Sequence, residues 1–315
     1  MRKSKKSFVF LTGGLGNQLF QLAFLMTRDS ERKIAEVTLG RPRINSINLP
    51  DVFDFNFSPP IEYRILSKDS AIARKFIGYL LRAGLQDNSR KWLLFFTSCI
   101  QVIANIVISI KLHQTVKTVY SKDNGFIHIP ESKGNEYLIG YFQSYRWLSE
   151  EAELREFFNE LKLRNPSDEL IKFLELYGGK KTLAIHVRLG DYLQDPTLGV
   201  LDYGYYELAI RQLYDEDQYE EIWLFSNELE KAMLYIPDCY KPLVRIVPDF
   251  SGSSAETLEA MRYASAYVIA NSSLSWWGAT LSYSENPKVI APKPWFAGKL
   301  EPKDLIPSEW KQIER

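Results

Sequence analysis

The chain has 315 residues, enough for two domains of ordinary size, and its 45% apolar content is that of a globular protein with a substantial core. Its 39 basic and 39 acidic side chains balance, which argues against a nucleic-acid scaffold, so no nucleic-acid partner is expected. The two cysteines, Cys99 and Cys239, lie far apart and predict neither a disulfide framework nor a zinc site.

The N-terminal part of the chain reads as a strand, a glycine loop and a helix. Residues 8–11 form an apolar run that is too short for a signal-peptide core and predicts a strand. A glycine loop at residues 12–18 leads into an amphipathic helix, an arrangement that favours an anion at the helix N-terminus; the alternative is a tight turn without a ligand. Leu19 stands where the dinucleotide fingerprint has its third glycine, which counts against a nicotinamide-dependent oxidoreductase.

Residues 40–135 are hard to organise from their pattern. Residues 68–82 predict a basic amphipathic helix, and residues 92–110 run for 19 positions without a charge, which is long enough for a membrane span. Polar residues recur at every fourth position of that run and would form a stripe that a lone span facing lipid would not carry. They are Thr97, Gln101, Asn105 and Ser109. We therefore expect a helix that packs within the protein or lies at a membrane surface.

The middle of the chain begins with an aromatic cluster at residues 140–147, where Gln and Arg are interleaved with the rings. Such a mixture suits stacking on a sugar or a base, and the alternative is a core role for the aromatic residues. Ser149 is predicted to cap a helix with an apolar face that ends near Leu161. A second helix begins at residues 166–168 and ends at the glycine pair 178–179.

From residue 183 onward, apolar runs alternate with helical patterns. Strands are predicted at residues 183–187, 222–225, 244–247, 267–270 and 289–291. Helices are predicted at residues 205–214, 228–235, 255–263 and 274–282. This alternation predicts a parallel, doubly wound α/β sheet, followed by an extended segment at residues 292–307 that Trp310 docks.

Polar side chains follow these strands, at the sheet edge where ligands bind in open α/β folds. They are Arg188 and Asp191, Ser226 and Asn227, Asp249, and the run from Asn271 to Ser273. The planar guanidinium of Arg188 suits a diphosphate, and the alternative is an Arg–Asp pair that only holds the turn. Ser272 and Ser273 open the next helix, where they either bind phosphate oxygens or merely cap the helix. At least one of Trp276 and Trp277 is expected in the core.

Four segments together resemble the family 11 glycosyltransferases, the α-1,2-fucosyltransferases. They are residues 13–21 (GGLGNQLFQ), 140–145 (GYFQSY), 186–191 (HVRLGD) and 271–279 (NSSLSWWGA). The resemblance implies a GT-B-like α/β architecture of two Rossmann-like domains facing across a cleft. Residues 1–165 would form the acceptor-side domain and residues 166–315 the domain that binds the GDP-sugar. It also implies GDP-fucose as the donor, inversion at the anomeric carbon, and no cofactor or metal.

The resemblance also implies roles for individual residues. Arg188 would bind the β-phosphate of GDP and stabilise its departure, with Ser272 and Ser273 on the other side of the diphosphate. Asn17 would lie near the reacting centre. Further donor-side residues would be Gly14 and Gly16 in the glycine loop, Asn227, Asp249, and Glu256 toward guanine. His186 and Asp191 are general-base candidates by residue type. Tyr141 and Gln143 are acceptor-binding candidates.

The acceptor implied by the family is a galactose-containing glycan that is fucosylated on its 2-hydroxyl. Without a signal peptide or N-terminal anchor in the sequence, we expect a bacterial cytoplasmic enzyme that acts on a lipid-linked glycan, with peripheral contacts to the inner membrane from residues 68–82 and 92–110. Two alternatives remain: another GDP-sugar transferase of similar fold, and a relative that binds glycans without catalysing transfer.

Overall fold

The computed structural model describes residues 4–37, 49–54, 61–65, 103, 106, 108–110, 115–121, 124–126, 128–130, 132–298 and 301–315. The helix expected at residues 68–82 lies outside these residues, as does most of the uncharged run at 92–110. Within the part of the chain that is described, no helix has the length and apolar content needed to cross a membrane.

The chain divides into two compact units. The first comprises residues Met1–Leu161 and Pro302–Leu305, and the second comprises Lys162–Glu301 and Ile306–Arg315. The observed boundary after Leu161 lies four residues before the expected division after residue 165. That residues 302–305 belong to the first unit was not expected. That segment binds the first unit through its backbone: the amide of Phe126 donates to the carbonyl of Lys303 at 2.7 Å, and the amide of Tyr145 donates to that of Asp304 at 2.9 Å.

The first unit is built on a five-stranded sheet in the order β4-β2-β1-β6-β5, and all of its strand pairs are parallel. The strands are β1 (Lys6–Leu11), β2 (Arg32–Val37), β4 (Ile61–Ile65), β5 (Lys117–Tyr120) and β6 (Glu136–Ile139). The other elements are α1 (Leu15–Met26), α2 (Leu49–Val52), β3 (Phe53–Asp54), α5 (Arg146–Ser149) and α6 (Ala152–Asn159). The strand order reverses between β1 and β6, so the loops after these two strands flank a switch point, where α/β sheets bind ligands.

The second unit contains a six-stranded sheet in the order β10-β9-β8-β11-β12-β13, again with all pairs parallel. Its strands are β8 (Thr182–Val187), β9 (Glu221–Ser226), β10 (Val244–Ile246), β11 (Ala266–Val268), β12 (Lys288–Lys293) and β13 (Lys311–Glu314), with the short β7 (Lys162–Leu163) before them. Its helices are α7 (Asp168–Tyr177), α8 (Tyr203–Glu216), α9 (Leu229–Ala232), α10 (Ser254–Arg262) and α11 (Ser273–Thr280). In chain order this is the Rossmann arrangement 3-2-1-4-5-6, whose switch point lies between β8 and β11.

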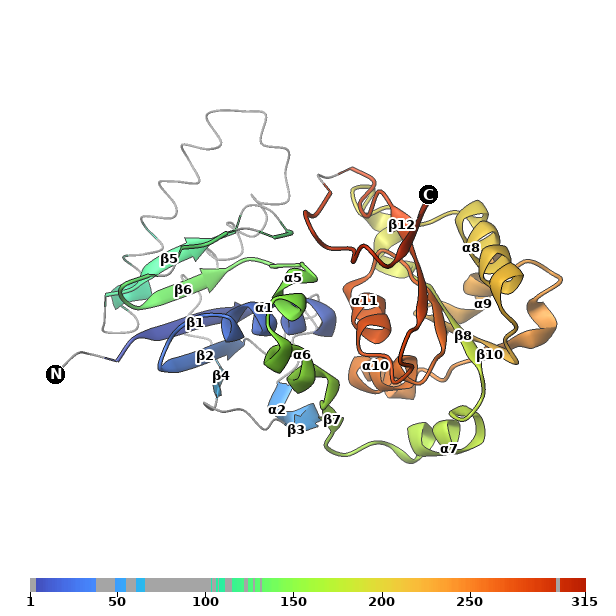
Figure 1. Ribbon diagram of the computed structural model, residues 1–315, viewed down its shortest axis with the longest axis horizontal. Coiled ribbons are helices and arrows are strands. Elements are labelled where there is room, and N and C mark those ends of the chain that lie inside the picture. The colour runs from blue at the N-terminus through green and yellow to red at the C-terminus, as the bar shows by residue number, and fades with distance from the viewer. Residues whose placement is uncertain are drawn as a thin grey trace. The chain divides into compact units, whose positions relative to one another are not determined.

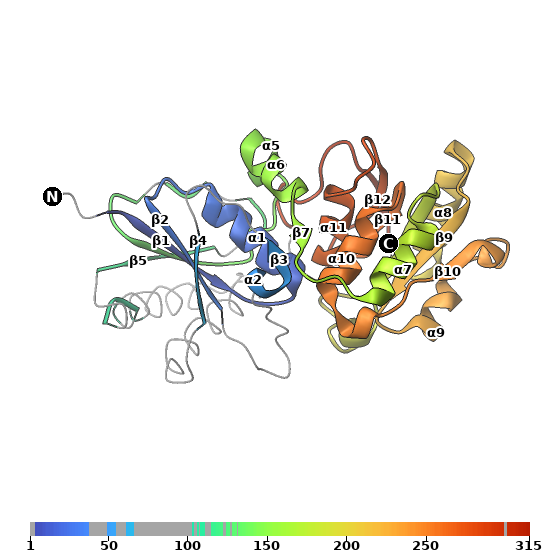
Figure 2. The same cartoon turned by 90° about the horizontal axis from the view of Figure 1, so that it is seen from below.

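Helices cover both faces of the second sheet, with α8 and α9 on one side and α10 and α11 on the other (Figures 1 and 2). All six residues of β8 are buried, which explains why a strand covered on both faces reads as an uninterrupted apolar run. Against one face packs a cluster that includes Tyr205, Tyr206 and Ile210 of α8. Trp276 and Trp277 of α11 are fully buried, so the core role expected for at least one of them is confirmed.

The predicted alternation from residue 183 onward is confirmed, with small shifts of the element ends. Two local expectations are wrong. Ser149 ends α5 instead of capping the next helix, whose N-cap is Glu151. Strand β13 was not expected, because an edge strand with only Ile313 buried carries no apolar run. Trp310 docks as expected: it is 9% exposed and lies 5.8 Å from Trp276 between ring centres.

Candidate functional site

Arg188 follows β8 at the switch point of the second sheet. One of its guanidinium nitrogens donates to Asp191 at 2.8 Å, and its remaining N–H groups have no acceptor among the described residues. The two side chains are 31% and 64% exposed. An ion pair this exposed stabilises a fold by at most about 1 kcal/mol, so holding the turn does not account for the arginine. Arg188 therefore offers donors to a ligand at this edge.

Asn227, which follows β9, supports the Arg188 turn from the neighbouring strand. Its Oδ1 accepts a hydrogen bond from the amide of Leu189 at 3.0 Å. Gly190 adopts φ +60°, and a Cβ at that position would lie 2.3 Å from Nδ2 of Asn227. Only glycine allows this close approach without displacing Asn227. The structure thus gives Asn227, predicted to bind the donor, a defined role in shaping the turn.

Ser272 and Ser273 directly follow Asn271, the residue that corresponds in register to Arg188 across the switch point. In the β8–β11 ladder Ile185 pairs with Val268, so Arg188 and Asn271 each come three residues after that pair. Ser272 is the N-cap of α11 by backbone conformation, but its side chain makes no capping hydrogen bond. Neither serine hydroxyl has a partner among the described residues. These hydroxyls and the amides of the first helical turn, which have no partner within the helix, are groups that can donate hydrogen bonds to an anion.

Asn271 fixes the start of this turn from the opposite side. Its Nδ2 donates to the carbonyls of Leu198 and Gly199 at 2.9 and 3.3 Å. Arg315 binds the same loop from the C-terminal strand and donates to the carbonyls of Leu198 and Val200 at 3.1 and 3.2 Å. The loop at residues 198–200 is therefore held between two side chains, and it in turn holds the segment that precedes Ser272.

His186 lies inside β8, not in the turn, and is 6% exposed. Its Nδ1 is buried without a partner in the described part of the chain, while its carbonyl accepts from the hydroxyl of Tyr206 at 3.1 Å. Burial, with a smaller contribution from Arg188, lowers the pKa of His186 to about 3. A base with so low a pKa is poorly matched to proton abstraction near neutral pH, which argues against His186 as the general base.

Glu256 and Asp249 differ in their surroundings. Glu256 is 8% exposed, and its two carboxylate oxygens accept from the amide and the hydroxyl of Ser167 at 3.0 and 2.6 Å. This carboxylate therefore ties the N-cap of α7 to the first turn of α10, and its role toward guanine stays a prediction. Asp249 is exposed at the carboxyl edge beyond β10, where its side chain has no partner among the described residues.

In the first unit, the glycine loop is held across the switch point between β1 and β6. The side chain of Gln21 accepts from the amide of Thr12 at 2.8 Å and donates to the carbonyl of Gly140 at 2.9 Å. Gln18 donates to the carbonyl of Gly13, which adopts φ +80°. Of the two predicted glycines, Gly14 is exposed and precedes α1, whereas Gly16 is buried in its first turn. Only Gly14 presents its backbone to a ligand.

Asn17 and Gln143, predicted separately, are in direct contact. Nε2 of Gln143 donates to Oδ1 of Asn17 at 2.8 Å, and Gln143 is 7% exposed. This bond leaves Nδ2 of Asn17 without an acceptor in the described part of the chain, so that it can donate to a ligand. Tyr141 instead packs against the hydrophobic cluster that contains Tyr137, and burial raises the pKa of Tyr141. Its predicted contact with an acceptor finds no support in this packing.

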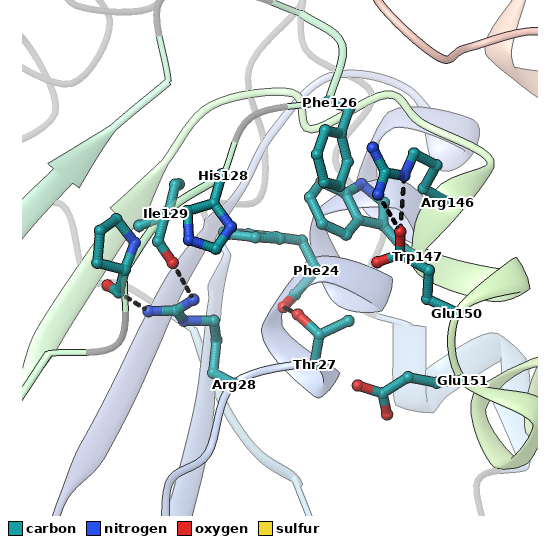
Figure 3. A pocket seen from close by; sticks show the side chains of 11 residues that line it. Phe24, Thr27, Arg28, Phe126, His128, Ile129, Arg146, Trp147, Glu150 and Glu151 are labelled. Atoms are coloured by element: carbon teal, nitrogen blue, oxygen red, sulfur yellow. Dashed lines mark hydrogen bonds and ion pairs between the residues drawn. The ribbon is translucent and has the colours of Figure 1, made fainter.

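A pocket of about 250 Å³ lies beside the C-terminal end of α1 in the same unit (Figure 3). Trp147 lies between Phe24 and Phe126, with 4.8 Å between its ring centre and each of theirs. Arg146 covers Phe126 at 3.7 Å and pairs with Glu150. These aromatic rings pack against one another and against Arg146, which is the core role that was the alternative for the aromatic cluster. None of the predicted site residues lines this pocket.

Sequence reasoning missed two residues that shape the site, Gln21 and Tyr192. Gln21 is the one polar residue in the run from Leu19 to Met26, which was a usable signal, because a polar side chain on a buried helix must find hydrogen-bond partners. Tyr192 gave no such signal. Its hydroxyl donates to the carbonyl of Asn271, 79 residues away in sequence.

Comparisons with known proteins bear on the family and the fold. A family model, "Glycosyl transferase family 11", matches residues 6–314. An alpha-1,2-colitosyltransferase of Escherichia coli is 27% identical over 323 residues, which cover 97% of this chain and 98% of that protein. The O-antigen biosynthesis glycosyltransferase WbnK of Escherichia coli is 35% identical over 134 residues, 41% of this chain and 43% of WbnK.

Among solved structures, the fucosyltransferase NodZ from Bradyrhizobium matches with a TM-score of 0.50 and 14% identity, over 89% of this chain and 94% of NodZ. NodZ soaked with GDP-fucose gives the same TM-score and identity. At this identity the likeness concerns the fold, and it confirms the expected GT-B-like α/β class with two Rossmann-like units; that these face each other across a cleft stays a prediction. Since the family model spans nearly the whole sequence, the chain belongs to glycosyl transferase family 11.

Proposed function

We propose that this glycosyltransferase transfers L-fucose from GDP-fucose to the 2-hydroxyl of a galactose-containing glycan, with inversion and without a metal. The observation that carries the proposal is the pairing of Arg188 with the Ser272–Ser273 turn at the switch point of the second sheet. A guanidinium and two hydroxyls at a helix N-terminus, all with donors that have no acceptor among the described residues, suit the charge of a nucleotide diphosphate. The family and the colitosyltransferase and O-antigen relatives support transfer of a sugar to a glycan.

The charge that develops during transfer explains why these groups would matter. As the bond from fucose to phosphate breaks, the sugar gains oxocarbenium character and the leaving diphosphate gains negative charge. Arg188 can donate to the β-phosphate from one side, while Ser272, Ser273 and the N-terminus of α11 donate from the other. The turn that Asn227 and Gly190 shape carries Arg188, and the contacts of Asn271 hold the start of the serine turn, so little reorganisation would be needed in the transition state.

The acceptor side of the proposal rests on the first unit. Asn17 has a donor group available in the glycine loop, and Gln143 fixes the orientation of that side chain. We assign Asn17 to the sugar or the diphosphate near the reacting centre, and Gln143 to its support. Asp191 is a better general-base candidate than His186, because its carboxylate is exposed and has one oxygen without a partner among the described residues. His186 is too deeply buried for that role.

A second candidate donor is GDP-colitose, because the colitosyltransferase relative spans nearly the whole chain. Colitose is fucose without its 3-hydroxyl, so both donors place the same diphosphate at Arg188. They differ only where the sugar meets the protein. A hydrogen bond to the 3-hydroxyl would favour fucose strongly, whereas an apolar surface there would accept both sugars.

The test is a donor panel of GDP-fucose, GDP-colitose and GDP-mannose with a galactose-terminated glycan. A matched acceptor whose terminal galactose lacks the 2-hydroxyl serves as the control. We expect fucose transfer to the first acceptor only, with an α-linkage at position 2 in the NMR spectrum of the product. Transfer of colitose alone would replace the donor assignment. GDP-fucose binding without transfer to any acceptor would favour the non-catalytic relative, and transfer to the control acceptor would refute the 2-hydroxyl assignment.

A further inference from the structure

Tyr192 contacts both halves of the proposed diphosphate site. It lies in the 3₁₀ turn Gly190–Gln194, directly after the residues that place Arg188. The Arg188 guanidinium lies over its ring, 5.5 Å from the ring centre. Its hydroxyl donates to the carbonyl of Asn271 at 3.0 Å. One side chain therefore contacts the arginine that follows β8 and the residue that precedes Ser272 after β11.

The phenol of Tyr192 is suited to this contact because it stays protonated. Burial raises the pKa of Tyr192 to about 12, although Arg188 lowers it, while Asp191 and Asp195 raise it further. The hydroxyl is thus a hydrogen-bond donor throughout the neutral range, and a carbonyl is a partner that can only accept. The ring offers the negative face of its π system to Arg188, which favours a cation above it.

The carboxyl ends of β8 and β11 need such a connection. The two strands pair up to Ile185 and Val268; beyond that pair β11 ends, whereas β8 continues beside β9 to Val187. Arg188 also has a competing partner in Asp191, whose carboxylate would draw the guanidinium toward solvent. Asn271 is already fixed on its far side by the carbonyls of Leu198 and Gly199. Tyr192 supplies the contact on the near side.

We propose that Tyr192 is a positioning residue that holds Arg188 and the Ser272–Ser273 turn at the separation needed to bind one nucleotide diphosphate between them. The proposal rests on the function proposed above, in which these two elements bind GDP. In this role Tyr192 touches neither the sugar nor the phosphates. It acts by keeping the two sets of donors organised before the donor substrate binds.

The experiment compares Tyr192→Phe and Tyr192→Leu with wild type in two assays, titration of GDP and steady-state fucose transfer. Tyr192→Phe keeps the ring under Arg188 and removes the bond to Asn271, so we expect GDP to bind about fivefold more weakly with little change in kcat. Tyr192→Leu removes the ring as well, so we expect kcat to fall a further tenfold or so because Arg188 turns toward Asp191.

Tyr267→Phe is the matched control. Tyr267 lies on β11, is 2% exposed, and donates its hydroxyl to the carbonyls of Met261 and Ala264 at 2.8 and 3.0 Å. This variant loses phenol–carbonyl contacts that are more deeply buried than that of Tyr192 and lie away from the site, so it should be less stable to heat yet bind GDP like wild type. Equal losses of GDP affinity in Tyr192→Phe and Tyr267→Phe would overturn the proposal, since both would then reflect general destabilisation.

A double-mutant cycle with Ser273→Ala separates positioning from a merely structural role. If Tyr192 organises the serine turn, the effect of Ser273→Ala on GDP affinity should be smaller in the Tyr192→Phe background than in wild type. Strictly additive effects, or GDP affinity of Tyr192→Phe within twofold of wild type, would refute the role. If the wild-type protein binds no GDP, the proposed function is refuted. If the wild-type protein binds GDP and Tyr192→Phe binds it equally well, only the role of Tyr192 is refuted.

Discussion

Replacing Gly190 by alanine perturbs the Arg188 turn without touching Arg188. Gly190 has φ +60°, a conformation that costs an alanine about 1 to 2 kcal/mol. The added Cβ would lie 2.3 Å from Nδ2 of Asn227, so Asn227 must move and release the amide of Leu189. Leu189 is 1% exposed, and leaving its amide unpaired costs a further 1 to 3 kcal/mol or so. We therefore expect Gly190→Ala to lower the free energy of unfolding by about 2 to 5 kcal/mol.

The assay is urea denaturation followed by tryptophan fluorescence. Five of the seven tryptophans lie in the second unit, so the signal reports mainly on the sheet that carries Gly190. Gly179→Ala is the matched control, because Gly179 belongs to the same unit, has no positive φ, and has nothing within 4 Å of an added Cβ. That variant should be as stable as wild type or slightly more stable, since alanine restricts the unfolded chain.

A cycle with Asn227→Ala isolates the clash. Asn227→Ala removes the hydrogen bond to Leu189 but also makes room for a methyl group at residue 190. The double variant should therefore lose less stability than the sum of the single losses, leaving mainly the backbone strain of alanine. A Gly190→Ala protein within about 0.5 kcal/mol of wild type, or full additivity with Asn227→Ala, would refute this description of the turn.

Further predictions concern turnover, metal dependence and acid stability. Arg188→Ala and Arg188→Lys should each lose roughly a hundredfold in kcat while keeping a wild-type circular dichroism spectrum, because lysine lacks the planar fork of donors; near-normal turnover would remove Arg188 from catalysis. Ser273→Ala should lose about fivefold, the worth of one neutral hydrogen bond. Activity should persist after treatment with EDTA and should not require added magnesium, and loss that magnesium restores would contradict the metal-independent mechanism. The buried, neutral His186 binds its proton only near pH 3, whereas the unfolded chain binds it below pH 6.5, so stability should fall as the pH drops from 6.5 toward 3. Between pH 8 and pH 5, the free energy of unfolding measured by urea denaturation should fall by about 2 kcal/mol less in His186→Gln than in wild type. An unchanged pH dependence would refute the burial argument.

Much of the second unit could be predicted from sequence because its central strands are buried on both faces. Strands such as β8 and β9 read as apolar runs, and short polar segments mark where they end. Edge strands lack this signal, which is why β13 escaped prediction. In the first unit the glycine loop and α1 were predictable, whereas the helix expected at residues 68–82 lies outside the described residues.

The site could be predicted as a set of residues, but its internal contacts could not. Position after a strand was enough to nominate Arg188, Asn227 and Ser273, since parallel strands present their carboxyl ends at one edge. It could not reveal that Asn227 serves the backbone of Leu189, or that Asn17 is bonded to Gln143, 126 residues further along the chain. Such bonds depend on the register of strands that are distant in sequence, and no local pattern encodes them.

The most direct test of the central claim is a crystal structure of the protein with GDP bound. The account predicts that the diphosphate lies at the switch point of the second sheet, with Arg188 on one side and the hydroxyls of Ser272 and Ser273 with the first turn of α11 on the other. Tyr192 should remain in contact with both Arg188 and Asn271. A diphosphate bound elsewhere in the second unit, or one held only by the glycine loop of the first unit and out of reach of Arg188, would contradict the account.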